Sequence, residues 1–154
     1  MNELEALAPA ARVALRHKLA AWSDQREPHA VQLVEQSHDL LPKRITNAQL
    51  SGLENIVGQA PTYREIRAFL DNQATRANKG GRLDVAGYWN ALAEVLSMLR
   101  REAEQLWSEV APADLADRQR RAAIDELHVR LVREYVQHLV AHSLYLAGLS
   151  QPDR

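Results

Sequence analysis

The stretch that decides the fold runs from Asp84 to Val110 and reads DVAGYWNALAEVLSMLRREAEQLWSEV. Its apolar residues return every three or four positions, which is the period of an amphipathic α-helix. They are Val85, Tyr88, Trp89, Leu92, Val95, Leu96, Leu99, Ala103, Leu106 and Val110. We expect Asp84 to cap this helix and Pro112 to end it, because proline cannot donate a hydrogen bond inside a helix.

The segments on either side of this stretch have the same period. Downstream, a helix from Pro112 to Gly148 is predicted by a stripe of Ile124, Leu127, Leu131, Tyr135, Leu139 and Leu146. Upstream, Thr62 and Glu65 have the spacing of a capping box, and Gly80-Gly81 marks the end of the helix that follows. The apolar side of that helix is predicted to contain Tyr63, Ile66, Phe69, Leu70, Gln73 and Ala77.

Nearer the N-terminus, Thr46 and Gln49 repeat the capping-box spacing ahead of Leu50, Leu53, Ile56 and Val57. Gly58 suits a left-handed position at the end of that helix. The first segment is predicted to hold two helices. Pro9 begins one that runs to Trp22, with Val13, Leu15 and Leu19 as its apolar contacts, and Pro28 begins another that Pro42 stops.

No segment alternates apolar and polar residues as a strand would. The sequence therefore predicts an all-α, single-domain bundle of about five to six antiparallel helices joined by short loops. Residues 1–154 form one domain in this interpretation, with N-terminal helices in 1–42 and a helical core in 45–148. No linker long enough to divide the chain is visible.

Composition limits the classes of function. The 154 residues include no cysteine, which excludes a disulfide scaffold and a thiolate zinc site. The N-terminal residues show no signal-peptide pattern, and no apolar run approaches the ~20 residues that cross a bilayer. We expect a soluble, cytoplasmic protein without a membrane partner. The net charge of −1 is lower than a simple basic nucleic-acid binder usually carries.

Charge is nevertheless distributed unevenly along the chain. Basic residues dominate 62–82 and acidic residues dominate 84–114, and several arginines lie along the last predicted helix, including Arg118, Arg120 and Arg130. Pairing inside the bundle or a solvated surface explains this pattern, as does one face that meets an anion and another that meets a basic partner. Under the second interpretation the candidate nucleic-acid-binding residues are Arg64, Arg67, Arg76, Lys79, Arg82, Arg121 and Arg133.

No complete active site is recognisable. A serine elbow and a phosphate-binding loop are absent from the sequence, so we assign no catalytic residue and no cofactor. Glu134, His138 and His142 lie one turn apart on the last predicted helix and are the weak candidates for a metal site. A di-iron carboxylate bundle is an alternative, because Glu35 and His38 form a Glu-x-x-His element and 125–128 an imperfect copy of it.

Two stretches carry a resemblance to a known family. Ile45-Thr46-Asn47-Ala48-Gln49-Leu50 and the leucine-rich helix after it resemble the opening element of the small helical subunit of type III CRISPR effector complexes. The run REYVQHLVAHSLYL, from Arg133 to Leu146, is similar to the last helix of that family, and the segment from Thr62 to Arg82 resembles its middle helix. The N-terminal 40 residues have no counterpart there.

The resemblance implies a non-catalytic subunit of an RNA-guided ribonucleoprotein in antiviral defence. Copies of such a subunit stack along the effector filament, line the groove where guide and target RNA pair, and contact other subunits. Arg67, Arg76 and Arg133 would be backbone contacts by position. The alternatives are a protein-only helical adaptor or dimerisation module, which includes a homo-oligomer, and a metal-dependent helical bundle.

Overall fold

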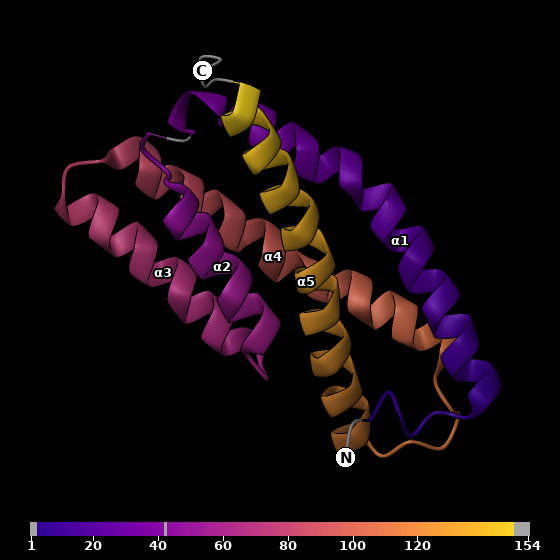
Figure 1. The fold of residues 1–154 in the computed structure, drawn as a ribbon. Helices are drawn as coiled ribbons and strands as arrows, with labels where there is room; N and C mark the ends of the chain where they lie inside the picture. Colours follow the sequence, from indigo (N-terminus) through magenta and orange to yellow (C-terminus); the bar gives the residue numbers. More distant parts are fainter. Residues whose placement is uncertain (1–2, 42, 150–154) are drawn as a thin grey trace.

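The computed structural model describes residues 3–41 and 43–149, and within these ranges it contains five α-helices and no strand (Figure 1). The helices are α1 (Pro9–Gln36), α2 (Asn47–Gln59), α3 (Tyr63–Lys79), α4 (Leu83–Val110) and α5 (Asp117–Leu149). A short 3-10 turn, η1 (His38–Leu40), follows α1. The predicted all-α bundle is therefore confirmed. None of the helices in the described ranges is long and apolar enough to span a membrane.

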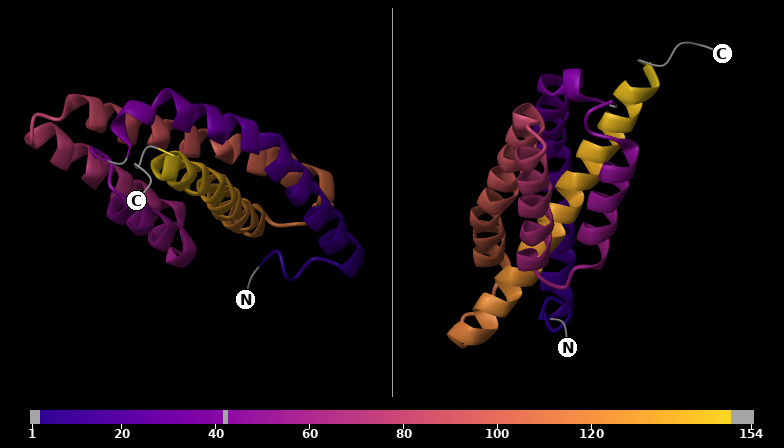
Figure 2. Two further views of the ribbon diagram at one scale, coloured as in Figure 1. Left: turned by 45° about the horizontal axis from the view of Figure 1, so that its top comes forward. Right: turned by 90° about the vertical axis from the view of Figure 1, so that its left-hand side faces the viewer.

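Helix α5 occupies the centre of the bundle, with α1, α2 and α4 packed around it (Figures 1 and 2). Leu131, Tyr135 and Leu139 on one line of α5 are fully buried, and so are Val132 and Val136 on the adjacent line. A helix that meets several neighbours must be apolar over more than one stripe. The sequence of α5 meets this requirement.

Sequential helices pack antiparallel from α2 onward, as predicted. Helix α1 is different, because it runs in the same direction as α5: Ser23 lies against Glu134, and Glu35 lies against His142 further along both helices. Its principal neighbour is α5 and not α2, the next helix in the chain. Figure 2 shows this arrangement from two further sides.

The prediction of two helices before residue 42 is wrong. Helix α1 continues through Pro28 as a single element of 28 residues. Proline removes one intrahelical bond, the one that would reach the carbonyl of Asp24. Both Pro28 and Asp24 are exposed, so water can hydrate that carbonyl while the opposite face stays packed. The helix ends at Gln36, and the predicted stop at Pro42 lies outside the described residues.

The start of α2 follows the prediction. The hydroxyl of Thr46 accepts the N–H of Gln49 at 3.2 Å, and the Gln49 side chain accepts the N–H of Thr46 at 2.9 Å. The prediction for its end is wrong, because Gly58 lies inside the helix and Ala60 is the C-terminal cap in an extended conformation. Pro61 disfavours helical geometry at the residue before it, which explains the position of this stop.

Three further predictions about termini need correction, and one is confirmed. Thr62 is the N-cap of α3, but its side chain makes no capping hydrogen bond. Asp84 lies in the first turn of α4 and not at its cap. Helix α5 begins five residues after Pro112, at Asp117. The predicted stop of α3 is confirmed, with Gly80 as C-cap and Gly81 at φ 74°.

One of the predicted apolar contacts of the first helix is also wrong. Val13 is 48% exposed, because it lies on the side of α1 that faces away from the bundle, whereas Leu15 and Leu19 are buried.

Candidate nucleic-acid interface

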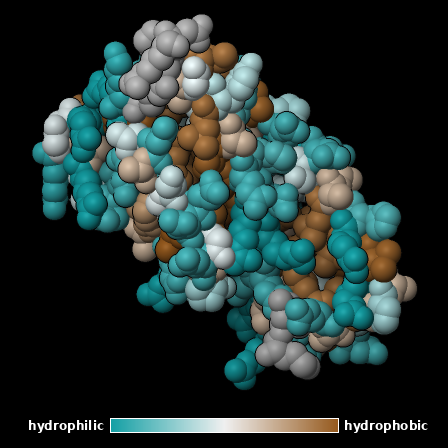
Figure 3. All heavy atoms as spheres, viewed as in Figure 1, coloured by the Kyte–Doolittle hydropathy of each residue, from teal (hydrophilic) through white to brown (hydrophobic). Residues whose placement is uncertain are grey.

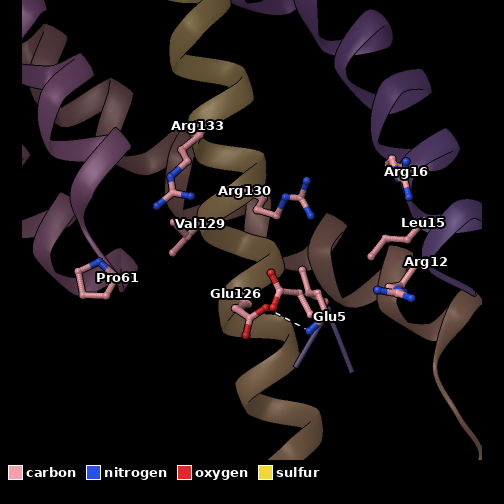
Figure 4. A pocket seen from close by; sticks show the side chains of 10 residues that line it. Glu5, Arg12, Leu15, Arg16, Pro61, Glu126, Val129, Arg130 and Arg133 are labelled. Atoms are coloured by element: carbon pink, nitrogen blue, oxygen red, sulfur yellow. Dashed lines mark hydrogen bonds between the residues drawn. The ribbon is translucent and has the colours of Figure 1, made fainter. Parts of the chain in front are cut away.

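A basic concavity lies between the N-terminal segment, α1 and α5, with Pro61 at its edge (Figure 4). Its volume is about 640 Å³. We call it the arginine groove; it is lined by Leu4, Glu5, Arg12, Leu15, Arg16, Pro61, Glu126, Val129, Arg130 and Arg133. On the same face, Figure 3 shows a hollow between α1 and the lower half of α5 with a hydrophobic floor and a hydrophilic rim.

Three of the four arginines come from positions that leave their guanidinium groups available. Arg12 and Arg16 lie one turn apart on α1 and face the groove across from Arg130 on α5 (Figure 4). All three residues are exposed, and their side chains form no ion pair with any residue of the described ranges. Arginine guanidinium groups bind phosphate oxygens through paired N–H donors. The groove therefore presents donors that no group of the described residues occupies.

The carboxylate of Glu126 is used to hold the N-terminal segment. It accepts the backbone N–H of Glu3 at 2.7 Å and that of Leu4 at 3.2 Å. Leu4 and Leu7 are buried, so residues 3–7 are packed onto the bundle beside the groove. Glu5 is the other acidic residue of the lining. Four arginines therefore face two glutamates, and the charge balance of the groove is positive.

The fourth arginine, Arg133, forms hydrogen bonds within the protein. Its Nε donates to the carbonyl oxygen of Val57 at 2.7 Å, and its Nη2 donates to that of Ala60 at 3.4 Å. The carbonyl of Val57 lies in the last turn of α2 and that of Ala60 at its C-cap, where intrahelical donors run out. Arg133, expected from the family resemblance to contact nucleic acid, thus joins α5 to the end of α2, and the residue is half-buried.

The other predicted basic residues do not form one face. Arg64 and Arg67 line a separate cavity between α3, α4 and α5. Arg76 and Arg82 line a smaller hollow at the far end of α3, Lys79 is exposed beside them, and Arg121 is exposed on the first turns of α5.

Arg67 is itself partly engaged within the protein. Its Nε donates to Asp71 at 3.0 Å and its Nη1 donates to Ser97 at 2.8 Å. The hydrogen bond with Asp71 raises the pKa of Arg67 above its ordinary value. This guanidinium is therefore charged and held in one orientation.

Arg12 and Arg16 are not among the binding residues that the sequence predicts, and Arg130 is there one of several arginines along the last helix. The available signal was their spacing of four, which places Arg12 and Arg16 on one side of a helix. Such pairs are common on solvated helices. Only the parallel packing of α1 on α5 turns them into a cluster with Arg130.

The proposed metal-ligand candidates are engaged between α1 and α5. The hydroxyl of Ser23 donates to Glu134 at 3.0 Å and lies 2.8 Å from Nε2 of His138. Nε2 of His142 lies 3.5 Å from a carboxylate oxygen of Glu35. In residues 3–41 and 43–149 no three His, Cys, Asp or Glu side chains are placed to hold a metal ion.

The two Glu-x-x-His-like elements of the di-iron alternative have different surroundings. His38 is exposed in η1, just after α1, with its Nε2 3.0 Å from a carboxylate oxygen of Asp39, whereas His128 is buried and bound to the carbonyl of Leu96. Because these elements lie on α1 and α5 with unrelated partners, the arrangement of the described residues offers no observation in favour of a di-iron site.

Comparison with known protein families, curated proteins and solved structures finds no match to this chain. What the chain binds must therefore be argued from the arginine groove and its surroundings.

Proposed function

We propose that this protein is a non-catalytic subunit that holds a nucleic-acid backbone in the arginine groove. The observation that carries the proposal is the convergence of Arg12, Arg16 and Arg130, none of which pairs with a described carboxylate. Phosphate contacts by arginine orient a nucleic acid without reading its sequence. Among its described residues the lining contains no Asn, Gln or exposed aromatic side chain to read or stack on a base, so backbone contact is the mode that it favours.

The nucleic acid we propose is RNA, in a complex of the type III CRISPR kind. Support comes from the resemblance of residues 45–50 and 133–146 to the small subunit of those complexes. The structure changes which residues we propose as backbone contacts. Arg133 and Arg67 are engaged within the protein, so the unpaired guanidinium groups of Arg12, Arg16 and Arg130 become the principal contacts.

Fluorescence anisotropy with a labelled single-stranded RNA, measured over a salt series, tests the proposal. The variant Arg12→Ala/Arg16→Ala/Arg130→Ala removes three phosphate contacts. Each contact contributes about 0.7 to the slope of log K against log salt, so the slope should become less steep by about 2. The reduction should be the same for every RNA sequence, because only the backbone is contacted.

A matched control variant carries Arg101→Ala, Arg118→Ala and Arg120→Ala. These arginines are exposed and lie outside the groove, and the change in net charge is identical. The control should keep most of the affinity. Equal losses in the two variants, or no RNA binding by the wild-type chain either alone or in its assembly, would refute the proposal.

A protein partner is the second candidate, favoured by the surface at the end of α5. Leu144, Tyr145 and Leu149 are 45%, 60% and 64% exposed, which is unusual for three large apolar side chains within two turns. Sedimentation velocity of the wild type and of Tyr145→Glu would detect self-association through this surface. A subunit of a ribonucleoprotein needs such contacts as well, so this candidate is compatible with the first.

A further inference from the structure

A second cavity lies on the other side of the turn between α2 and α3. Pro61 lines the arginine groove, and the next residue, Thr62, lines this cavity. Its volume is about 610 Å³, in the range of small-molecule sites. Helices α3, α4 and α5 supply its walls, which are formed by Thr62, Tyr63, Arg64, Arg67, Ala68, Asp71, Ser97, Arg100, Asp125 and His128.

Three arginines line this cavity, and two of them are held in place by acidic partners. Arg67 is bound to Asp71 and Ser97, and Arg100 is bound to Asp125 and lies 3.7 Å from Glu104. Arg64 is exposed and pairs with no described residue. The cavity thus combines two oriented guanidinium groups with one that is available, against the two aspartates of its lining.

His128 is the buried polar group of the cavity, with a side chain only 2% exposed. Its Nε2 lies 2.9 Å from the carbonyl oxygen of Leu96, so this nitrogen must carry the hydrogen. Burial lowers the pKa of His128, which keeps the ring neutral near pH 7. Nδ1 then has a lone pair and no hydrogen-bond partner among the described residues.

The rest of the wall fits an organic group beside an anion. The ring of Tyr63 packs against His128 with centroids 4.4 Å apart, and its hydroxyl is bound to Ser97 at 2.7 Å. Tyr63 and Ala68 make part of the wall apolar. The cavity is also many times larger than the ~30 Å³ that one water occupies, so it has room for more than a phosphate ion.

We propose that this cavity binds a phosphomonoester: its phosphate pairs with Arg64, Arg67 and Arg100, and a hydroxyl of its organic part donates to Nδ1 of His128. A free nucleotide and the 5′-phosphorylated end of an RNA strand share this chemistry. The site is separate from the arginine groove and uses none of its residues. It therefore does not rest on the function proposed for the groove.

Isothermal titration with the full chain tests the proposal, using AMP, GMP, CMP and UMP as probes and adenosine as the uncharged comparison. The monophosphates should bind and adenosine should not. Arg64→Ala should weaken monophosphate binding at least tenfold, whereas Arg118→Ala should leave it unchanged. His128→Gln keeps a donor for Leu96 but moves the acceptor from the position of Nδ1 to the amide oxygen, so it should weaken nucleotide binding and leave inorganic phosphate binding intact.

Two RNA dinucleotides, one with a 5′-phosphate and one with a 5′-hydroxyl, distinguish the two sources of the ligand. Preference for the phosphorylated dinucleotide over the free nucleotides identifies a strand end, and the reverse identifies a free nucleotide; both support the site. The proposal is overturned if no monophosphate binds at millimolar concentration, or if Arg64→Ala has no effect. The groove variant Arg12→Ala/Arg16→Ala/Arg130→Ala should retain the part of AMP binding that Arg64→Ala weakens, which keeps the two proposals independently testable.

Discussion

Replacing Pro28 by alanine tests whether α1 is one helix. In a helix interior proline is about 3 kcal/mol less favourable than alanine, because it lacks the N–H and its ring crowds the preceding turn. Two effects reduce the gain. Proline also restricts the unfolded chain, which is worth about 0.4–1 kcal/mol. The carbonyl of Asp24, which lacks its donor, belongs to an exposed residue, where water can hydrate it. We expect Pro28→Ala to stabilise the protein by about 1–2 kcal/mol.

Urea denaturation followed by circular dichroism gives the free energy of unfolding of each variant. For a chain of this size the expected gain corresponds to a rise in Tm of about 2–8 °C. Pro112→Ala is the matched control, because Pro112 lies between α4 and α5 and outside any helix. It should be neutral or slightly destabilising, by at most about 1 kcal/mol.

A loss of stability in Pro28→Ala, or a gain no larger than that of Pro112→Ala, would refute a continuous α1. It would favour the arrangement predicted from the sequence, with one helix that ends near Trp22 and another that begins at Pro28. Hydrogen exchange gives an independent readout. The new N–H at position 28 should be protected if it donates to Asp24, and it should exchange freely if α1 is broken there.

Four further predictions concern stability and pH. Arg133→Ala should lower the free energy of unfolding by about 1–3 kcal/mol in urea titrations, because two carbonyls at the end of α2 lose a charged donor; Arg133→Lys should recover part of this. Leu131→Ala, at a fully buried position of the central helix, should cost about 2–5 kcal/mol in the same assay. Burial raises the pKa of Tyr135 from 10.0 to about 12, so the folded state retains this proton more tightly. The contribution of protonated Tyr135 to the free energy of unfolding is present below pH 10 and is lost as the pH rises toward about 12. Tyr135→Phe should flatten this decline in urea titrations at alkaline pH. Burial lowers the pKa of His128 below 6.5. The contribution of the neutral ring to the free energy of unfolding is therefore present above pH 6.5, and it is lost as the pH falls through the lower pKa of the folded state. The difference between wild type and His128→Gln from pH 7.5 to 5 measures it, and parallel curves would contradict it.

The helices were largely predictable because their signals are local. The capping box at Thr46 forms as expected, since the two groups that it joins are three residues apart. The end of α3 at Gly80-Gly81 was predictable for the same reason, because its signal is local. The errors arose where two local signals competed. At the end of α2, Pro61 acts on Ala60 and overrides the preference of Gly58 for a terminus.

The predicted helix start at Pro28 is wrong for a different reason. Proline is a strong local signal for a helix start, and nothing nearby in the sequence opposes it. What opposes it is the packing of α1 on α5 along both sides of Pro28, through Ser23 before it and Glu35 after it. Tertiary contacts on one face can offset a missing backbone bond on the other. Such contacts join residues more than 100 positions apart, so no local pattern contains them.

The candidate sites likewise depend partly on local sequence patterns and partly on tertiary packing. The sequence by itself determined an all-α bundle, the register of its apolar stripes and the abundance of arginine, because these follow from periods of three to four residues. Only the tertiary structure decided which arginines are available. Arg133 is engaged at the end of α2, while Arg12 and Arg16 meet Arg130 across a groove. The physical reason is that a guanidinium pairs with whatever the fold brings within hydrogen-bond distance, and that depends on helix packing over the whole chain.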